Sequence, residues 1–227
     1  MVTTYIPKAE VPTVATTAES KERSATEASR LAVGTRIRSA RTERGTSLRE
    51  LARRLGVSAG HISQVERGMV APSISLLYSI ASELSLSMDT LFGEDRTGPG
   101  EYEGIEKSPG EERFITRSAE RRKIDLDTGV RWELLTPTPH EVVDFREIVY
   151  APGGGSSKPG EFIRHSGREY GLVLEGVLHV QLEFEDFMLG PGDSIAFDSR
   201  VPHRLWNEND KTSARAVWCT YSEPVDS

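Results

Sequence analysis

The stretch that decides the fold is Ser47–Gly68, SLRELARRLGVSAGHISQVERG. It predicts two short helices joined by a tight turn. In the first helix four apolar residues fall at i, i+3, i+4 and i+7, the spacing of one helical face: Leu48, Leu51, Ala52 and Leu55. Ser47 precedes this face and Glu50 follows three residues on, which is a capping-box pattern. Gly56 stands where the helix can end in the left-handed conformation.

The second helix of the stretch is predicted to present a small, polar and basic surface. Ser58 stands at its start as a cap, Ile62 and Val65 form its inner face, and Gly68 ends it. Its outer face then carries Ala59, Gly60, Ser63, Gln64 and Arg67. A short helix of this kind, set at an angle on another, fits a DNA major groove.

The pattern LxxLAxxLGVSxxxISQxExG at Leu48–Gly68 resembles the helix-turn-helix of phage-repressor-type regulators, the XRE family. Apolar faces on either side complete the expected helices: Val33, Ile37 and Ala40 before it, and Ile74, Leu77, Ala81 and Leu84 after Pro72 and Ser73. A fifth helix is expected from Ser87 and Asp89 to Leu91, Phe92 and Gly93. The resemblance implies an all-α, five-helix DNA-binding domain over residues 31–93. The alternative is a helical module that no longer touches DNA.

The resemblance also assigns a DNA-binding set, in which the second helix of the motif enters the major groove: Ser47, Arg49, Ser58, Ala59, Gly60, His61, Ser63, Gln64 and Arg67. Gln64 is the expected base contact, because its amide can bond adenine N6 and N7 together. The phosphate candidates, each with solvated surface as the alternative, are Arg36, Arg38, Arg44, Arg49 and Arg67. Arg41 and Glu66 match positions that pair between helices in such repressors, which implies a structural ion pair.

Length and charge agree with two domains of different character. A chain of 227 residues with 37% hydrophobic content has room for about two globular domains. Residues 31–93 carry eight Arg or Lys and five acids, a balance of +3, whereas residues 94–227 carry sixteen and twenty-six, a balance of −10. This asymmetry is typical of a protein in which one domain meets phosphate. Because +3 is modest, we expect DNA binding to require a dimer and to weaken with salt.

Cysteine content and hydropathy bear on the compartment. Cys219 is the only cysteine, so no intramolecular disulfide can form, and a reducing cytoplasm is expected. Cys219 is expected to be a small buried residue of the last strand, with a reactive thiol as the alternative. The sequence has no run of eighteen apolar residues and no apolar signal core, so membrane insertion and export are not expected.

The chain divides by composition. Residues 1–30 are expected to be a mobile N-terminal tail, residues 94–112 a Gly-, Pro- and acid-rich linker, and residues 223–227 a C-terminal tail. From residue 113, short apolar or alternating runs recur every eight to twelve residues. The expected strands are Phe114–Thr116, Val130–Leu135, Asp144–Tyr150, Tyr170–Leu174, Val177–Phe184, Ser194–Phe197 and Ala214–Tyr221. This cadence predicts an all-β sandwich or barrel.

Two segments within the β region, HSGREYGLVLEG from His165 and PGDSIAFDSRVPHRLWN from Pro191, resemble the two signature motifs of the cupin superfamily. The resemblance implies a double-stranded β-helix of jelly-roll type over residues 113–222, following the helical domain in an α+β multidomain chain. It also implies a metal site of His165, Glu169 and His203, because these match three of the four usual ligands, while Ile163 stands at the position of the first His.

Two imidazoles and one carboxylate would suit one divalent ion of Fe, Zn, Mn or Ni. The alternative is that the three side chains are polar pocket residues without a metal. Further candidates for an effector pocket are Glu161, Tyr170, Phe197 and Asn207. For these the alternatives are exposed surface for Glu161, barrel core for the two aromatic residues and a turn role for Asn207.

The predicted function is a sequence-specific transcriptional regulator whose cupin domain senses a small-molecule effector or a metal. The expected partners are a homodimer formed through the cupin domain and a double-stranded operator, palindromic with half-sites about ten base pairs apart or a multiple of that. The alternative from another class is a non-heme iron(II) cupin oxygenase resembling hydroxypropylphosphonate epoxidase, and a third is a cupin whose helical domain mediates protein contacts only.

Overall fold

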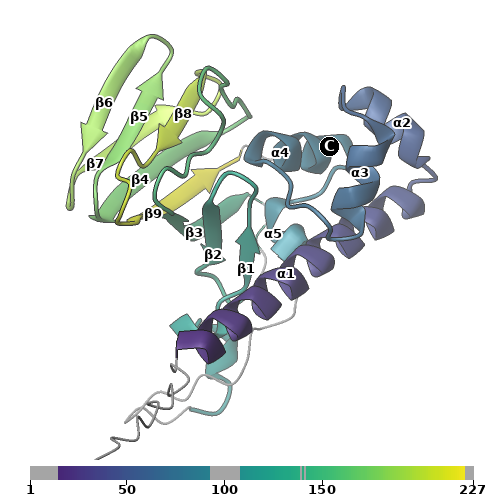
Figure 1. The fold of residues 1–227 in the computed structure, drawn as a ribbon, viewed down its shortest axis with the longest axis horizontal. Helices are drawn as coiled ribbons and strands as arrows, with labels where there is room; N and C mark the ends of the chain where they lie inside the picture. Colours follow the sequence, from purple (N-terminus) through teal and green to yellow (C-terminus); the bar gives the residue numbers. More distant parts are fainter. Residues whose placement is uncertain (1–14, 93–107, 139, 141, 223–227) are drawn as a thin grey trace, which may run out of the picture.

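Helices form the N-terminal part of the molecule and antiparallel strands form the rest (Figure 1). The structure is a computed structural model that describes residues 15–92, 108–138, 140 and 142–222. The N-terminal residues 1–14, most of the predicted linker (94–107) and the predicted C-terminal tail lie outside the described residues. We call residues 15–92 the helical domain and residues 108–222 the cupin domain.

The helical domain contains the five helices that the sequence predicts. They are α1 (Ala15–Glu43), α2 (Leu48–Arg54), α3 (Ala59–Glu66), α4 (Ile74–Glu83) and α5 (Met88–Phe92). The predicted N-terminal tail is wrong for residues 15–30, which form the first half of α1. Alanine, glutamate, lysine and arginine dominate this segment and no Gly or Pro interrupts it, so the helix continues although no apolar face is repeated.

Serine caps set the helix starts. The hydroxyls of Ser47, Ser58 and Ser73 each accept a hydrogen bond from the backbone N–H three residues on, at 3.1, 3.1 and 3.2 Å. The second bond of the predicted capping box, from the Ser47 backbone N–H to the Glu50 carboxylate, is wrong. The carboxylate instead accepts hydrogen bonds from two arginines of its own helix, Arg53 and Arg54. An exposed carboxylate near two guanidinium groups gains more from charge-assisted bonds than from one backbone N–H.

The cupin domain consists of nine antiparallel strands in two sheets. The six-stranded sheet has the order β1-β2-β3-β9-β4-β7 and the three-stranded sheet the order β6-β5-β8. Their bounds are β1 (Lys123–Asp125), β2 (Val130–Leu134), β3 (Val143–Tyr150), β4 (Arg168–Glu175), β5 (Leu178–Leu182), β6 (Glu185–Leu189), β7 (Ser194–Asp198), β8 (His203–Trp206) and β9 (Ala214–Tyr221). The predicted all-β jelly-roll domain is therefore confirmed.

The strand predictions fail at one run and miss three others. Residues 114–116 are not a strand but follow the 3-10 turn Glu111–Arg113. A second 3-10 turn, Ser118–Glu120, leads into β1. The missed strands β1, β6 and β8 have three to five residues and little apolar alternation, so their pairing depends on neighbouring strands rather than on their own pattern.

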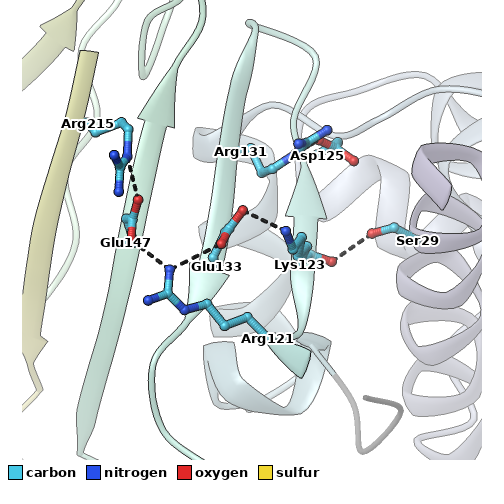
Figure 2. A network of polar contacts seen from close by, with 8 residues as sticks. All are labelled: Ser29, Arg121, Lys123, Asp125, Arg131, Glu133, Glu147 and Arg215. Carbon is cyan, nitrogen blue, oxygen red and sulfur yellow. Dashed lines mark hydrogen bonds and ion pairs between the residues drawn. The ribbon is translucent and has the colours of Figure 1, made fainter. Parts of the chain in front are cut away.

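The helical domain is attached to the six-stranded sheet through α1, which lies alongside β1 (Figure 1). The Ser29 hydroxyl donates a 2.7 Å hydrogen bond to the Lys123 carbonyl. From Lys123 a chain of ion pairs crosses four strands, through Glu133, Arg121, Glu147 and Arg215, at N–O distances of 2.7–3.3 Å (Figure 2). This network joins α1 to the middle of the sheet. No helix of the described residues is long and apolar enough to cross a bilayer.

Candidate nucleic-acid interface and candidate metal centre

The predicted DNA-reading helix is α3, and its outward side chains lie at the surface. Ser58, Gly60, Gln64 and Arg67 are exposed, whereas Ala59, His61 and Ser63 are half-buried. On the preceding helix, Ser47 and Arg49 are also exposed. The inner face is fully buried, with Ile62 and Val65 at 0% and 1% exposure. The amphipathic division predicted from the sequence is therefore present, and Gln64 is accessible to a base.

A buried ion pair fixes α3 to α1. The Arg41 Nε donates to Glu66 Oε1 at 2.6 Å, and its Nη2 donates to Glu66 Oε2 at 3.0 Å. The remaining Nη1 donates to the carbonyl of Thr46 at 2.8 Å, just before the cap of α2. The predicted structural pair is confirmed. Because a bidentate pair fixes both distance and orientation, it holds α3 in position relative to the other helices.

The arginines predicted to contact phosphate divide into two groups. Arg36 donates a hydrogen bond to the Leu91 carbonyl. Arg44 donates hydrogen bonds to the carbonyls of Ala40 and Ser85. Arg38 and Arg49 are exposed, and Arg67 is exposed with its Nε bonded to the Ser63 carbonyl. Arg36 is therefore half-buried and held within the domain, whereas the other four arginines, Arg44 included, are exposed.

Three side chains from different strands and loops meet inside the barrel. His165, Glu169 of β4 and His203 of β8 each offer one ligand atom, and these atoms lie within 4.8 Å of one another. The two imidazole Nε2 atoms lie 2.9 and 3.1 Å from the same Glu169 oxygen, Oε1. All three atoms are buried and have no assigned hydrogen-bond partner among the described residues. Buried polar atoms that converge in this way fit the ligands of one metal ion.

The other polar atoms of the three side chains contact hydrogen-bonding partners outside the site. His203 Nδ1 lies 2.8 Å from the Val201 carbonyl, His165 Nδ1 lies 3.1 Å from the Ser166 carbonyl, and Glu169 Oε2 accepts a 2.6 Å bond from Trp218 Nε1. Such contacts fix the tautomers and direct Nε2 into the site. Burial disfavours the charged Glu169 carboxylate, but the two imidazoles outweigh burial and hold its pKa below the usual value. The residues therefore fit a divalent ion.

The walls of this pocket combine aromatic rings with a buried guanidinium. Arg146 of β3 is 1% exposed and lies over the Trp132 ring, 3.9 Å from its centroid. Its Nη1 pairs with Asp144 at 2.7 Å. The position of the missing first His, Ile163, is 6% exposed and lines the same pocket. An apolar side chain there leaves the three predicted ligands as the donor set.

The predicted effector residues do not line the pocket. Tyr170 follows the inward Glu169 on β4 and therefore lies on the outer face of the sheet, 46% exposed. Glu161 is exposed. Phe197 is buried against the His203 ring, 5.0 Å away, as a core residue. The Asn207 amide donates to the carbonyls of Tyr150, Ala151 and Thr212, which is the turn role.

The pocket contains residues that the sequence did not single out. Among these are Tyr78 on α4, Trp132 on β2, Arg146 on β3 and Trp218 on β9. A signal existed for one of them: Asp144 and Arg146 are opposite charges at i and i+2 of one predicted strand, so they share a face. The register between β3 and β9 decides which face of β3 points inward. This register cannot be read from the sequence of one strand. Cys219, expected to be buried, is half-buried on the outer face.

A capped recognition helix on a five-helix domain, joined to a jelly-roll barrel with a His–Glu–His centre, defines a DNA-binding regulator with a cupin domain. Comparisons with known proteins agree. Residues 37–91 match the helix-turn-helix family HTH_3, and residues 146–220 match the cupin domain family Cupin_2. The chain belongs to the XRE-type helix-turn-helix transcriptional regulators and carries a C-terminal cupin domain.

Three similar proteins illustrate the relationship. The HTH-type transcriptional regulator PuuR of Escherichia coli (strain K12) is 28% identical over 78% of this chain and 88% of its own. The "uncharacterized transcriptional regulator in ATPase CF(0) region" of Rhodospirillum rubrum is 38% identical over 32% of this chain and 68% of its own. The crystal structure of an HTH_3 family transcriptional regulator from Vibrio cholerae has a TM-score of 0.60 at 22% identity, covering 87% and 99% of the two chains.

Proposed function

We propose that this regulator binds its operator in the cytoplasm through α3 and that its cupin pocket senses a small-molecule effector or a divalent metal ion. The observation that carries the DNA part is the exposure of Gln64 and Arg67 on a helix whose inner face is buried and whose last residue, Glu66, is paired with Arg41. The ion pair makes the reading surface rigid before DNA arrives. DNA binding then does not cost the conformational entropy of ordering this surface.

The two exposed side chains of α3 have different chemical roles. The Gln64 amide has one donor and one acceptor, which match adenine N7 and N6 in the major groove. Arg67 is placed for a phosphate and gives affinity without base preference. Loss of Gln64 should therefore reduce discrimination, whereas loss of Arg67 should reduce affinity for all sequences and make the salt dependence less steep.

The test is selection of genomic DNA fragments by the purified full chain, followed by binding assays on the selected operator. Gln64→Ala with Arg67→Ala should weaken operator binding about tenfold or more, because a bidentate base contact and a phosphate contact are lost. Lys211→Ala, an exposed cation of the cupin domain, is the matched control. Unchanged binding by the double variant would show that the helical domain makes protein contacts instead.

The sensing part rests on the convergence of His165, Glu169 and His203. A divalent ion held there supplies Lewis acidity and open coordination positions for an effector oxygen. We expect alanine at all three positions to abolish binding of Zn²⁺ or Mn²⁺, measured by calorimetry. If the same variant also keeps operator affinity unchanged with and without each metal and each effector tested, the pocket is not a sensor of DNA binding.

The dimer is proposed from the outer face of the six-stranded sheet. Five large apolar side chains there are 37–46% exposed: Phe145, Tyr170, Leu172, Leu174 and Tyr221. Phe145 and Tyr170 both stand opposite Cys219 in the register, so one apolar row crosses β3, β9 and β4. A second copy placed on this row would present two α3 helices to a palindrome. Footprints of one asymmetric half-site bound by a monomer would contradict it.

A second candidate function is an iron(II)-dependent oxygenase, favoured by the His–Glu–His donor set. The same pocket would then hold substrate rather than effector. Iron-dependent oxygen consumption with a defined substrate, lost in Glu169→Ala, would place the protein in this class. Consumption that persists in this variant would exclude the pocket as its source.

A further inference from the structure

A side chain of the helical domain lies inside the pocket of the cupin domain. Figure 1 shows α4 at the boundary between the helices and the strands. From this helix, Ile74 and Tyr78 line the pocket together with His165 and Glu169. The Tyr78 ring is stacked on the His165 ring, with centroids 4.0 Å apart and planes at 12°. Its hydroxyl accepts a 2.8 Å hydrogen bond from Arg146 Nη2.

Tyr78 leaves little room in the pocket. The centre of a water-sized molecule can reach about 20 Å³ of the pocket, which is room for about one water molecule. With Tyr78 in place this space is too small for an organic molecule. Because protein interiors are close-packed, an organic ligand can enter only if a wall side chain leaves.

We propose that Tyr78 occupies the site of the organic effector, so that the effector displaces it and thereby undocks α4 from the cupin domain. The proposal rests on the proposed sensing function of the pocket and adds its mode of regulation. A ligand shifts an equilibrium between two states only if it binds them differently. Here the Tyr78 ring and the effector require the same space, so the effector binds only the state in which Tyr78 has left the pocket.

The contacts of Tyr78 define the chemistry of the ligand that replaces it. A planar group takes the place of the phenol ring on His165, and an oxygen acceptor takes the bond from Arg146. Arg146 Nε and Trp132 Nε1 are buried donors without a hydrogen-bond partner among the described residues, and both residues line the pocket. Asp144 already pairs with Arg146, but these two buried donors stay unsatisfied, and a carboxylate oxygen would give each a charge-assisted bond. The ligand class is therefore a small planar carboxylate.

Displacement of Tyr78 has a local consequence outside the pocket. The loop before α4 contacts the cupin domain through the Asp127 N–H, which donates to the Pro72 carbonyl at 3.3 Å. Pro72 lies two residues before α4, so this bond reports whether α4 is docked. If α4 moves away, the Asp127 amide loses its partner and exchanges with solvent faster.

The experiment titrates benzoate, a planar carboxylate, into the full-length protein by calorimetry and follows hydrogen exchange at the Asp127 amide. Wild type must lose its Tyr78 contacts to bind, whereas Tyr78→Ala has none to lose. We expect the Kd of Tyr78→Ala to be at least tenfold lower than that of wild type, the factor for a hydrogen bond to a charged group. Tyr78→Phe, which lacks only the bond to Arg146, should lie between them.

Two further readouts complete the test. Saturating benzoate should speed exchange at Asp127 in wild type and leave it unchanged in Tyr78→Ala, where it is already fast. Benzyl alcohol, which has the ring without the charge, should bind Tyr78→Ala at least tenfold more weakly than benzoate. Tyr78→Phe retains the ring and keeps the test readable if the alanine variant does not fold.

Each contrary result overturns a defined part of the proposal. Equal benzoate affinity in wild type and both variants would show that Tyr78 does not occupy the site. Binding by none of the three proteins would overturn the carboxylate class, and binding to wild type without faster exchange at Asp127 would overturn the coupling. The experiment does not measure operator binding. Its outcome is therefore independent of whether the proposed DNA-binding function is correct.

Discussion

Two buried ion pairs, one in each domain, hold charged side chains against a partner of opposite charge. Arg41 and Glu66 are 8% and 6% exposed in the helical domain, and Arg146 and Asp144 are 1% and 9% exposed in the barrel. A charge taken out of water is costly, and a partner at hydrogen-bond distance offsets that cost. At the residue scale, removal of one partner therefore has a larger effect than removal of an exposed pair.

Glu66→Ala should destabilise the helical domain by about 3–5 kcal/mol, because it leaves the Arg41 guanidinium buried without compensation. Chemical denaturation followed by circular dichroism measures the change. Glu50→Ala is the control, since Glu50 also pairs with arginines of a helix but at the surface, and it should change stability little. If both substitutions lowered the free energy of unfolding equally, burial of the Arg41–Glu66 pair would not be the cause of the effect.

At the scale of elements, a glycine sets the distance between α1 and α3. A Cβ built on Gly34 would lie 2.3 Å from the Val65 carbonyl oxygen and 2.7 Å from that of Glu66. Those carbonyls belong to the backbone at the end of α3, so they cannot move away cheaply. The mid-helix glycine therefore permits the close approach that places the DNA-reading helix.

Gly34→Ala should destabilise the protein by about 1–3 kcal/mol through overpacking, although alanine is the better helix former. In Gly60→Ala, within α3, the nearest atom to the new Cβ is 3.9 Å away, so this control should stabilise by roughly 0.5–1 kcal/mol. Thermal unfolding of both variants gives the comparison. A stabilising Gly34→Ala would mean that the two helices are free to separate.

The ion-pair network across the sheet predicts a pH effect. Burial disfavours the charged Glu147 carboxylate, but bonds from Arg215 and Arg121 outweigh burial and hold its pKa below the ordinary value of 4.5. The folded state then binds fewer protons than the unfolded state in this range. The stabilisation is complete above pH 4.5 and is lost as pH falls through the lowered native pKa.

Glu147→Gln should accordingly reduce the decline in the free energy of unfolding between neutral pH and acid. Urea unfolding at a series of pH values measures it. Glu185→Gln, on the exposed strand β6, serves as control and should keep the wild-type profile. An unaltered profile in Glu147→Gln would mean that the arginines do not favour its ionised form in the folded state.

At the scale of the whole molecule, the DNA-binding helices and the pocket are joined through α1 and α4, while apolar side chains on the outer face of the sheet stay exposed among the described residues. The apolar row on this face includes Leu172, which stands opposite Val217 on β9. Leu172 is 42% exposed in one chain. Exposed apolar residues gathered on one sheet face are typical of an interface.

If the proposed dimer forms, Leu172→Glu should convert it to a monomer and weaken operator binding at least tenfold, because two DNA-binding domains then act separately. Sedimentation velocity measures the association state and mobility shifts measure the affinity. Gln181→Glu, on the three-stranded sheet, is the control for the added charge. A wild-type protein that sediments as a monomer would contradict the proposed interface directly.

Much of the fold was predictable because its signals are local. The capping serines, the apolar spacing from Leu48 to Leu55 and the left-handed Gly56 and Gly68 each act within a few residues, and the structure confirms them. The metal candidates were also predictable, since His165 and Glu169 lie four residues apart and His203 follows in a recognisable motif. The lining of the pocket was not predictable, because Tyr78, Trp132 and Trp218 come from separate elements that only the tertiary structure brings together.

The sequence by itself determined the two domains, the helix proposed to read DNA and the three candidate metal ligands, since helical period, caps and motif spacing are properties of short segments. Only the tertiary structure decided what surrounds them. Tyr78 reaches His165 across 87 positions and Arg146 lies against Trp132, because packing of α4 on the barrel and the strand register place them together. Long-range contacts of this kind depend on the whole chain closing its core, and no local pattern encodes them.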